Sequence, residues 1–65
     1  MKEVGRIKKS KKLYLIVSEH DFKNMQMIDI REFAESPKGV VPTQKGVKFR
    51  REYISELINL LEGLV

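Results

Sequence analysis

The chain of 65 residues carries 13 lysines and arginines against 9 aspartates and glutamates, with one histidine and no cysteine. It is long enough for one small domain, but it has no disulfides to support a core and too few soft ligands for a structural zinc site. With 42% hydrophobic and 34% charged residues it is expected to fold as a globular domain, and oligomerisation is the remaining common way to stabilise so small a core.

The positive charge lies ahead of the C-terminal segment. Residues 1–49 hold 11 basic against 6 acidic side chains, a net charge of +5, whereas residues 50–65 hold 2 against 3, a net charge of −1. The stretch "GRIKKSKK" at 5–12, within a basic segment at 1–12, has five basic residues and no acidic one. Such a run attracts a polyanion, although a solvated terminus that only aids solubility has the same composition.

The first two predicted strands are "VGRI" at 4–7 and "KKLYLIVSE" at 11–19. In the second strand the period of two puts Leu13, Leu15 and Val17 on one face and Tyr14, Ile16 and Ser18 on the other. "HDFKN" at 20–24 has the composition of a turn, and Phe22 is expected at its tip.

"MQMIDIREF" at 25–33 resumes the alternation, with Ile28 and Ile30 facing inward. "AESPKGVVP" at 34–42 contains Ser-Pro and Lys-Gly and is predicted to be a reversing loop. "TQKGVKF" at 43–49 is predicted to be the last strand, in which Gly46 marks a bulge or a close backbone approach.

From about residue 51 the apolar spacing becomes helical. The pattern therefore predicts an α+β fold with three or four antiparallel strands at about 4–49 and one helix at about 51–63 that covers one sheet face, all in a single domain of residues 1–65. Leu60 lies beside the main helical stripe, which makes the apolar surface wider than one sheet needs. A second copy of the chain is the expected cover, and a monomer with an exposed helix is the alternative. The helical residues expected at this interface are Ile54, Leu57, Ile58, Leu60, Leu61 and Leu64.

The sheet face opposite the helix is predicted to be open. If Ile28 and Ile30 face the helix, then Asp29, Arg31 and Phe33 face away from it. The side chains expected beside them from neighbouring strands are Tyr14 and either Lys12 or Lys48. Aromatic rings among cations suit single-stranded nucleic acid, because unpaired bases stack on rings and cations neutralise phosphates.

Catalysis is not expected from this composition. The chain has no cysteine, one histidine, and no spaced carboxylates that would hold two metals or separate an acid from a base. Asp29 is interpreted as structural, paired with Arg31, and His20 as a surface or turn residue. Phe22, beside Lys23, is the clearest stacking candidate, unless it folds back over the edge of the core. No enzyme activity, metal or cofactor is predicted.

Three segments together resemble a known family. They are "DFKNMQMIDIREF" at 21–33, "SPKG" at 36–39 and "QKGVKF" at 44–49, followed by the amphipathic helix. They are similar to the core domain of the transcriptional coactivator positive cofactor four and its small bacterial and phage relatives, over nearly the whole chain. The resemblance implies a curved four-stranded antiparallel sheet plus one helix (ββββα), dimerising through the helices, with grooves that bind single-stranded DNA or melted duplex largely without sequence preference.

The resemblance also implies residue roles. Phe22 and Lys23 match the family's stacking aromatic and the lysine beside it. The other implied DNA-binding residues are Arg31 and Lys45, with Lys11 and Lys12 near a basic position of the first hairpin. Where the eukaryotic form has a stacking tryptophan and a further arginine, this chain has Ala34 and Gln44, so Phe33 or Tyr14 is expected to compensate.

These features predict a homodimeric single-stranded-DNA-binding protein that acts in transcription regulation, replication or repair. An RNA-binding or RNA-chaperone role is an alternative, because stacking and phosphate contacts do not read the 2′-hydroxyl. A protein-interaction module, in which the basic segment only steers association, is another. The chain has no apolar run of membrane-spanning length and no signal peptide pattern, so a cytoplasmic, nucleoid-associated location is expected.

Overall fold

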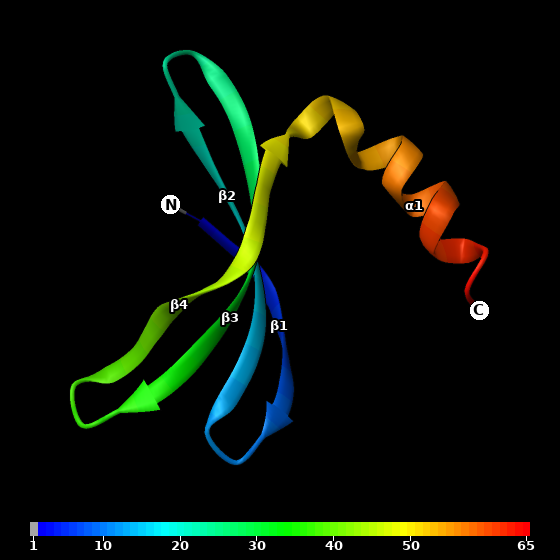
Figure 1. Ribbon diagram of the computed structural model, residues 1–65. Coiled ribbons are helices and arrows are strands. Elements are labelled where there is room, and N and C mark those ends of the chain that lie inside the picture. The colour runs from blue at the N-terminus through cyan, green and yellow to red at the C-terminus, as the bar shows by residue number, and fades with distance from the viewer. Residues whose placement is uncertain (1) are drawn as a thin grey trace.

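The computed structural model describes residues 2–65, which form one four-stranded antiparallel sheet followed by a helical segment (Figure 1). The sheet is a meander in the order β1-β2-β3-β4. The strands are β1 Lys2–Ser10, β2 Leu13–Phe22, β3 Met25–Ser36 and β4 Gly39–Arg50. A 3-10 turn, η1 (Arg51–Tyr53), leads into the helix α1 (Ile54–Glu62). The prediction of four antiparallel strands followed by one C-terminal helix is confirmed.

Two segments are more extended than the sequence indicated. The short strand expected at 4–7 is part of the nine-residue strand β1. The loop expected at 34–42 is wrong, because β3 continues to Ser36 and β4 begins at Gly39, which leaves a turn of two residues. Pro42 is accommodated within β4 because this strand lies at the edge of the sheet.

Each hairpin closes through two residues. Phe22 pairs with Met25 around a turn in which Lys23 has φ 51° and Asn24 has φ 66°. Positive φ at both central residues defines a type I′ turn, whose twist matches that of the flanking strands. Phe22 is thus the last residue of β2 and not the tip of a longer loop. Directly after the β3–β4 turn, the first residue of β4, Gly39, has φ 117°, a backbone conformation that residues other than glycine rarely adopt.

The strand register assigns side chains to two faces. Directly opposite residues of neighbouring strands share a face. The face that contains Arg31, here called the Arg31 face, consists centrally of Tyr14, Ile16, Ser18, Asp29, Arg31, Phe33 and Lys48. The opposite face, here called the Ile28 face, contains Leu15, Val17, Ile28, Ile30, Val47 and Phe49. The predicted separation of Ile28 and Ile30 from Asp29, Arg31 and Phe33 is confirmed.

Very few apolar side chains are buried. Among the described residues, the buried hydrophobic side chains are Ile16, Ile28 and Phe33. They come from the two central strands, where neighbours on both sides cover them. The three lie on both faces of the sheet, so the chain by itself has no single thick hydrophobic layer.

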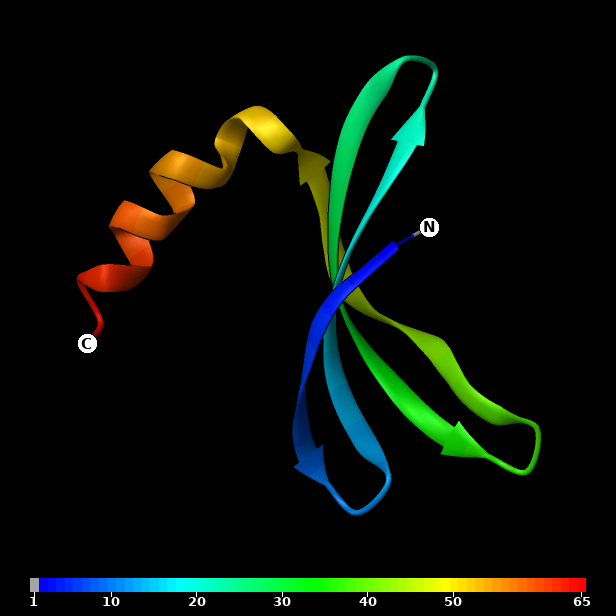
Figure 2. The same cartoon turned by 180° about the vertical axis from the view of Figure 1, so that it is seen from behind.

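The helix does not cover the sheet, which corrects the expected two-layer arrangement. α1 continues directly from η1 and extends away from the end of β4, and both views show it clear of the strands (Figures 1 and 2). No residue of α1, all of which the structure describes, is buried. The Ile28 face therefore keeps exposed apolar groups, including Ile7 and Val47.

Within residues 2–65, no helix has the length and apolar character needed to cross a membrane.

Candidate nucleic-acid interface

The tip of the β2–β3 hairpin presents an aromatic ring and a cation together. Phe22 is 54% exposed. The Nζ atom of Lys23 lies over its ring, 5.4 Å from the centroid. The alternative in which Phe22 folds back over the core is wrong for this structure. Stacking of a base on this face of the ring would have to displace Lys23, and the displaced ammonium group is close enough to contact a phosphate of the same strand.

The backbone of Lys23 is strained. Lysine has no side-chain group that stabilises the left-handed region, where it has φ 51°, and the conformation costs about 1–2 kcal/mol. Asparagine adopts this region more readily. We therefore expect Lys23→Asn to raise the free energy of unfolding by about 1 kcal/mol while lowering affinity for single-stranded DNA. Urea denaturation and a binding titration measure the two effects.

Lys38→Asn is the matched control, because it removes the same charge from the β3–β4 turn, where the backbone φ is not positive. It should not stabilise the fold. If Lys23→Asn is no more stable than wild type, the left-handed turn stores no strain.

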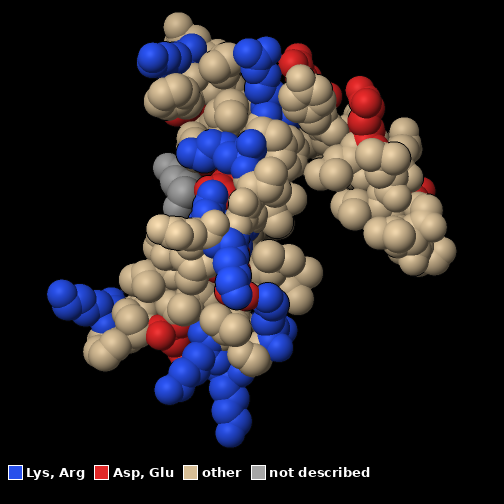
Figure 3. All heavy atoms as spheres, in the orientation of Figure 1, with Lys and Arg blue, Asp and Glu red and all other residues tan. Residues whose placement is uncertain are grey.

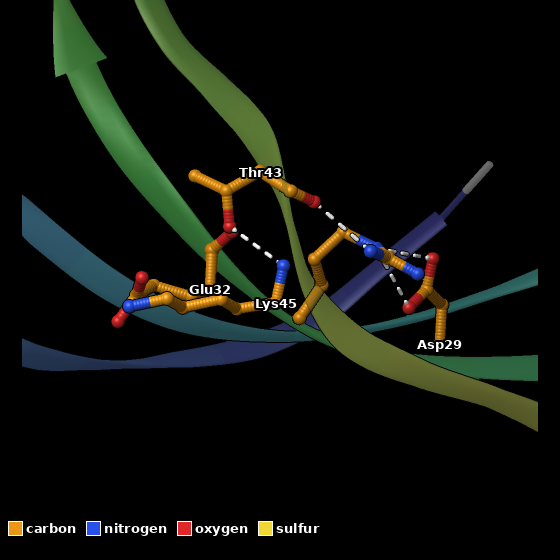
Figure 4. Close-up of polar contacts among 5 residues, drawn as sticks. Asp29, Glu32, Thr43 and Lys45 are labelled. Carbon is orange, nitrogen blue, oxygen red and sulfur yellow. Dashed lines mark hydrogen bonds and ion pairs between the residues drawn. The ribbon is translucent and has the colours of Figure 1, made fainter.

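On the Arg31 face, a partly buried ion pair is linked to the edge strand. The Nε atom of Arg31 lies 3.2 and 3.3 Å from the two carboxylate oxygens of Asp29. Its Nη1 atom donates to the carbonyl oxygen of Thr43 at 2.9 Å (Figure 4). The pairing of Asp29 with Arg31 is confirmed. The Arg31 side chain is only 21% exposed, so much of the cation is engaged within the protein.

The aromatic side chains of the Arg31 face are less available than predicted. Phe33 is 9% exposed, because Tyr14 and Pro42 lie directly opposite it on the neighbouring strands. Its predicted position on an open surface is wrong. Tyr14 is half-buried, and the guanidinium of Arg6 lies 5.3 Å from its ring centroid. Stacking of a base on Tyr14 would therefore have to displace Arg6.

A hollow of about 490 Å³ lies on the Arg31 face beside β4. Apolar surface from Phe33 and Pro42 and polar groups of both charges line it. The remaining lining residues are Asp29, Arg31, Thr43, Gln44 and Lys48. Lys48 is exposed, and in the strand register it lies directly opposite Asp29. A wide, mixed hollow of this kind can hold a flat polar group better than a purely apolar ligand.

The Ile28 face carries one buried acid with two nearby cations. Glu32 accepts a hydrogen bond from Nζ of Lys9 at 2.5 Å. The Lys45 side chain runs alongside the Glu32 side chain (Figure 4). The hydrogen bond from Lys9, with smaller contributions from the positive charges of Lys9 and Lys45, lowers the pKa of Glu32 below its ordinary value, against the opposing effect of desolvation. Glu32 thus stays ionised and links β1 to β3.

The predicted DNA-binding residues are spread over the sheet and do not form one cluster. Phe22 and Lys23 lie at one end of β2, and Lys11 and Lys12 form the turn at its other end, about 30 Å away at about 3.3 Å per residue. Blue side chains gather at the end of the sheet with the β1–β2 and β3–β4 turns, while α1 is largely uncharged with a few acids (Figure 3). The positive charge therefore follows the sheet.

Sequence reasoning missed Lys9, Glu32 and Thr43. A signal existed for Glu32, since its position in the alternation of β3 puts a carboxylate on the same face as Ile28 and Ile30, and a charge there needs a partner. No local signal identifies Lys9, because β1 contains two register irregularities. They break the simple alternation that would assign each of its side chains to one face of the sheet. Within residues 2–65, no three His, Cys, Asp or Glu side chains group to hold a metal.

Comparison with known proteins places this geometry in a family. The family described as Transcriptional Coactivator p15 (PC4) matches residues 7–60, which include most of the sheet and most of α1. The chain belongs to the PC4 family. PC4 domains are nucleic-acid-binding and non-enzymatic, and are known for binding single-stranded DNA.

Solved PC4 structures share the fold. The orthorhombic crystal structure of BPSL1147, a PC4 homologue from Burkholderia pseudomallei, is 24% identical, with a TM-score of 0.86 over 92% of this chain and 82% of that one. Its tetragonal form is 23% identical, with a TM-score of 0.83 over 92% of this chain and 90% of that one. At this identity the match concerns the fold alone. No curated protein matches the chain.

Proposed function

We propose that this PC4 domain is a non-catalytic homodimer that binds single-stranded DNA without strong sequence preference, in transcription regulation, replication or repair. The observation that carries the proposal is the β2–β3 tip, where an exposed ring and a cation 5.4 Å from its centroid occupy a strained turn. Strained backbone conformations persist where the surrounding structure enforces them, as the two-residue hairpin does here, and they cluster at functional sites. The site of action under this proposal is the cytoplasm, at melted regions of the nucleoid DNA.

Single-stranded DNA fits the tip better than duplex does. An unpaired base offers a free face to Phe22, and stacking contributes about 1–3 kcal/mol per base. In a duplex the same faces are covered by neighbouring base pairs. Phosphate contacts depend on charge and not on base identity. The lysines that supply them are Lys23, Lys45, Lys48 and those of the β1–β2 turn. Such contacts explain why no strong sequence preference is proposed.

The exposed apolar surface of α1 supports the proposed dimer. An isolated helix shorter than about 12–15 residues is marginal in water, and α1 has nine residues, none of them buried. Its most exposed apolar side chain is Leu60, at 73%, and Leu64, two residues beyond the end of the helix, is 83% exposed. A second copy offers both an equivalent helix and an apolar Ile28 face. Contact with that copy supplies the packing that α1 lacks within one chain.

Fluorescence anisotropy with labelled single-stranded DNA, duplex DNA and RNA of equal length tests the function. We expect single-stranded DNA to bind most tightly, with log K falling against log salt by about 0.7 per phosphate neutralised. Equal or tighter duplex binding would contradict the proposal. Preference for RNA would favour an RNA-binding role, and no binding at physiological salt would favour a protein-interaction module.

A further inference from the structure

Strand β4 is irregular where it passes Arg31. Arg31 pairs with Gly46 and Phe33 with Pro42, so the single residue Glu32 faces three residues of β4. These three, Thr43, Gln44 and Lys45, are called here the β4 bulge. A β-bulge changes the direction of the side chains around it and is a specific feature of a sheet, not a defect. Here the bulge places Gln44 in the hollow of the Arg31 face, while Lys45 lies beside Glu32.

Hydrogen bonds from β3 and within the bulge hold this conformation. Arg31 Nη1 donates to the Thr43 carbonyl oxygen at 2.9 Å. The Thr43 hydroxyl donates to the Glu32 carbonyl oxygen at 2.8 Å and accepts from the Lys45 amide at 3.2 Å. At Gly46, a Cβ atom would lie 2.8 Å from Cβ and Cγ of Arg31. β3 and β4 therefore approach closely here, and only glycine permits it.

Arg31 is in turn oriented by Asp29. Asp29 is 8% exposed, and its carboxylate accepts hydrogen bonds from Nε of Arg31. Nε is directed to Asp29 and one Nη1 donor to Thr43, which leaves three of the five guanidinium donors. The side chain that carries them is only 21% exposed, so an outside ligand has restricted access to it. Lys45 is exposed, and its ammonium group makes no hydrogen bond among the described residues, although it lies beside Glu32 (Figure 4). It is the better placed of the two cations for a phosphate.

We propose that Arg31 is a positioning residue, which holds the β4 bulge so that Lys45 contacts a phosphate of the bound strand. The inference rests on the proposed function and assigns Arg31 a role different from the direct contact implied by the family resemblance. A bulge ordered before binding lowers the entropy cost of fixing Lys45. Asp29 contributes indirectly to the position of Lys45, because it fixes the orientation of Arg31.

A salt series with single and double variants separates positioning from contact. Arg31→Lys keeps the charge and a partner for Asp29, but one ammonium group cannot reach both Asp29 and the Thr43 carbonyl. Losing one phosphate contact corresponds to about a fourfold loss of affinity at 0.15 M salt and a salt slope smaller by about 0.7. We expect this loss in Arg31→Lys, in Thr43→Val and in Lys45→Gln. The double variant Arg31→Lys/Lys45→Gln should bind no more weakly than Lys45→Gln alone.

Direct contact by Arg31 predicts a different pattern. Arg31→Lys would then keep the salt slope, or its loss would add to that of Lys45→Gln, and either result would overturn the inference. Unchanged binding by Thr43→Val would overturn it as well. Thr43→Ser retains the hydroxyl and should therefore keep the affinity for single-stranded DNA that Thr43→Val loses. Urea denaturation of each variant establishes that the comparison is among folded proteins.

Hydrogen exchange without DNA keeps this test distinct from that of the proposed function. The Lys45 amide donates to Thr43 Oγ1, so it should exchange faster in Arg31→Lys and in Thr43→Val. Unchanged exchange would show that Arg31 does not hold the bulge, even if the protein binds DNA well. If the wild type binds no oligonucleotide, the phosphate role of Lys45 fails together with the proposed function, whatever the exchange rates.

Discussion

Replacing Phe22 by alanine is expected to weaken binding to single-stranded DNA by about 1–3 kcal/mol, or roughly fivefold to 150-fold, because one stacked base loses its ring. The ring is 54% exposed, so its removal should change the free energy of unfolding little. The salt slope should stay near that of the wild type, since no phosphate contact is removed. Anisotropy titrations at several salt concentrations measure both quantities.

Two further substitutions at Phe22 identify the ring itself as the cause. Phe22→Tyr keeps an aromatic face and should retain most of the affinity. Phe22→Leu keeps an apolar side chain of similar size and should lose nearly as much affinity as alanine, because leucine has no flat π surface. Alanine or leucine variants that bind like wild type would show that Phe22 stacks no base.

The alternation of side chains in the central strands was predictable because it reflects burial. β3 has neighbours on both sides, and its odd and even positions meet different surroundings. The assignment of Ile28 to one face and Asp29 to the other therefore follows from the period of two alone. The exposure of the face containing Phe33 was not predictable in this way. Burial there depends on Tyr14 and Pro42, which reach Phe33 only through the pairing of strands.

The edge strands gave weaker or misleading signals. Every residue of β1 is exposed, so its sequence lacks an apolar alternation, and its lysines and arginines suit an edge that must avoid pairing with other chains. At the other edge, Pro37 occupies a tight turn but Pro42 lies within β4. Proline is tolerated at such an edge, where its missing N–H can face away from the ladder. Composition alone cannot distinguish these two positions.

The position of the helix was predicted incorrectly for a related reason. Its apolar spacing correctly indicates a helix with one apolar side, and the sequence-based expectation is that the chain's own sheet covers that side. The 3-10 turn η1 instead leads α1 away from the strands (Figure 2). A periodic pattern specifies which residues become buried but not which chain buries them. That difference makes the helix the most informative place for a substitution.

Ile58→Asp is therefore expected to convert a homodimer into a monomer. Ile58 lies in the apolar stripe of α1 and is 49% exposed in the single chain. Full burial of an exposed isoleucine side chain stabilises by about 1.5–3 kcal/mol, and about half of this remains to be gained by Ile58 at an interface. Two-fold symmetry places the substitution in both chains. The expected loss of about 1.5–3 kcal/mol per dimer, to which repulsion between the two carboxylates adds, raises the dimer dissociation constant by at least about 10-fold. Light scattering at micromolar concentration should give 7.6 kDa for the variant and twice that mass for the wild type.

Asn59→Asp is the matched control, because it adds the same charge at the next helical position, outside the apolar stripe. It should remain dimeric. The monomeric variant should also lose more affinity for a long oligonucleotide than for a short one, since only a long strand can engage both sheets of a dimer and gain from their linkage. A wild type of 7.6 kDa in solution, or a dimeric Ile58→Asp, would show that α1 does not join two chains.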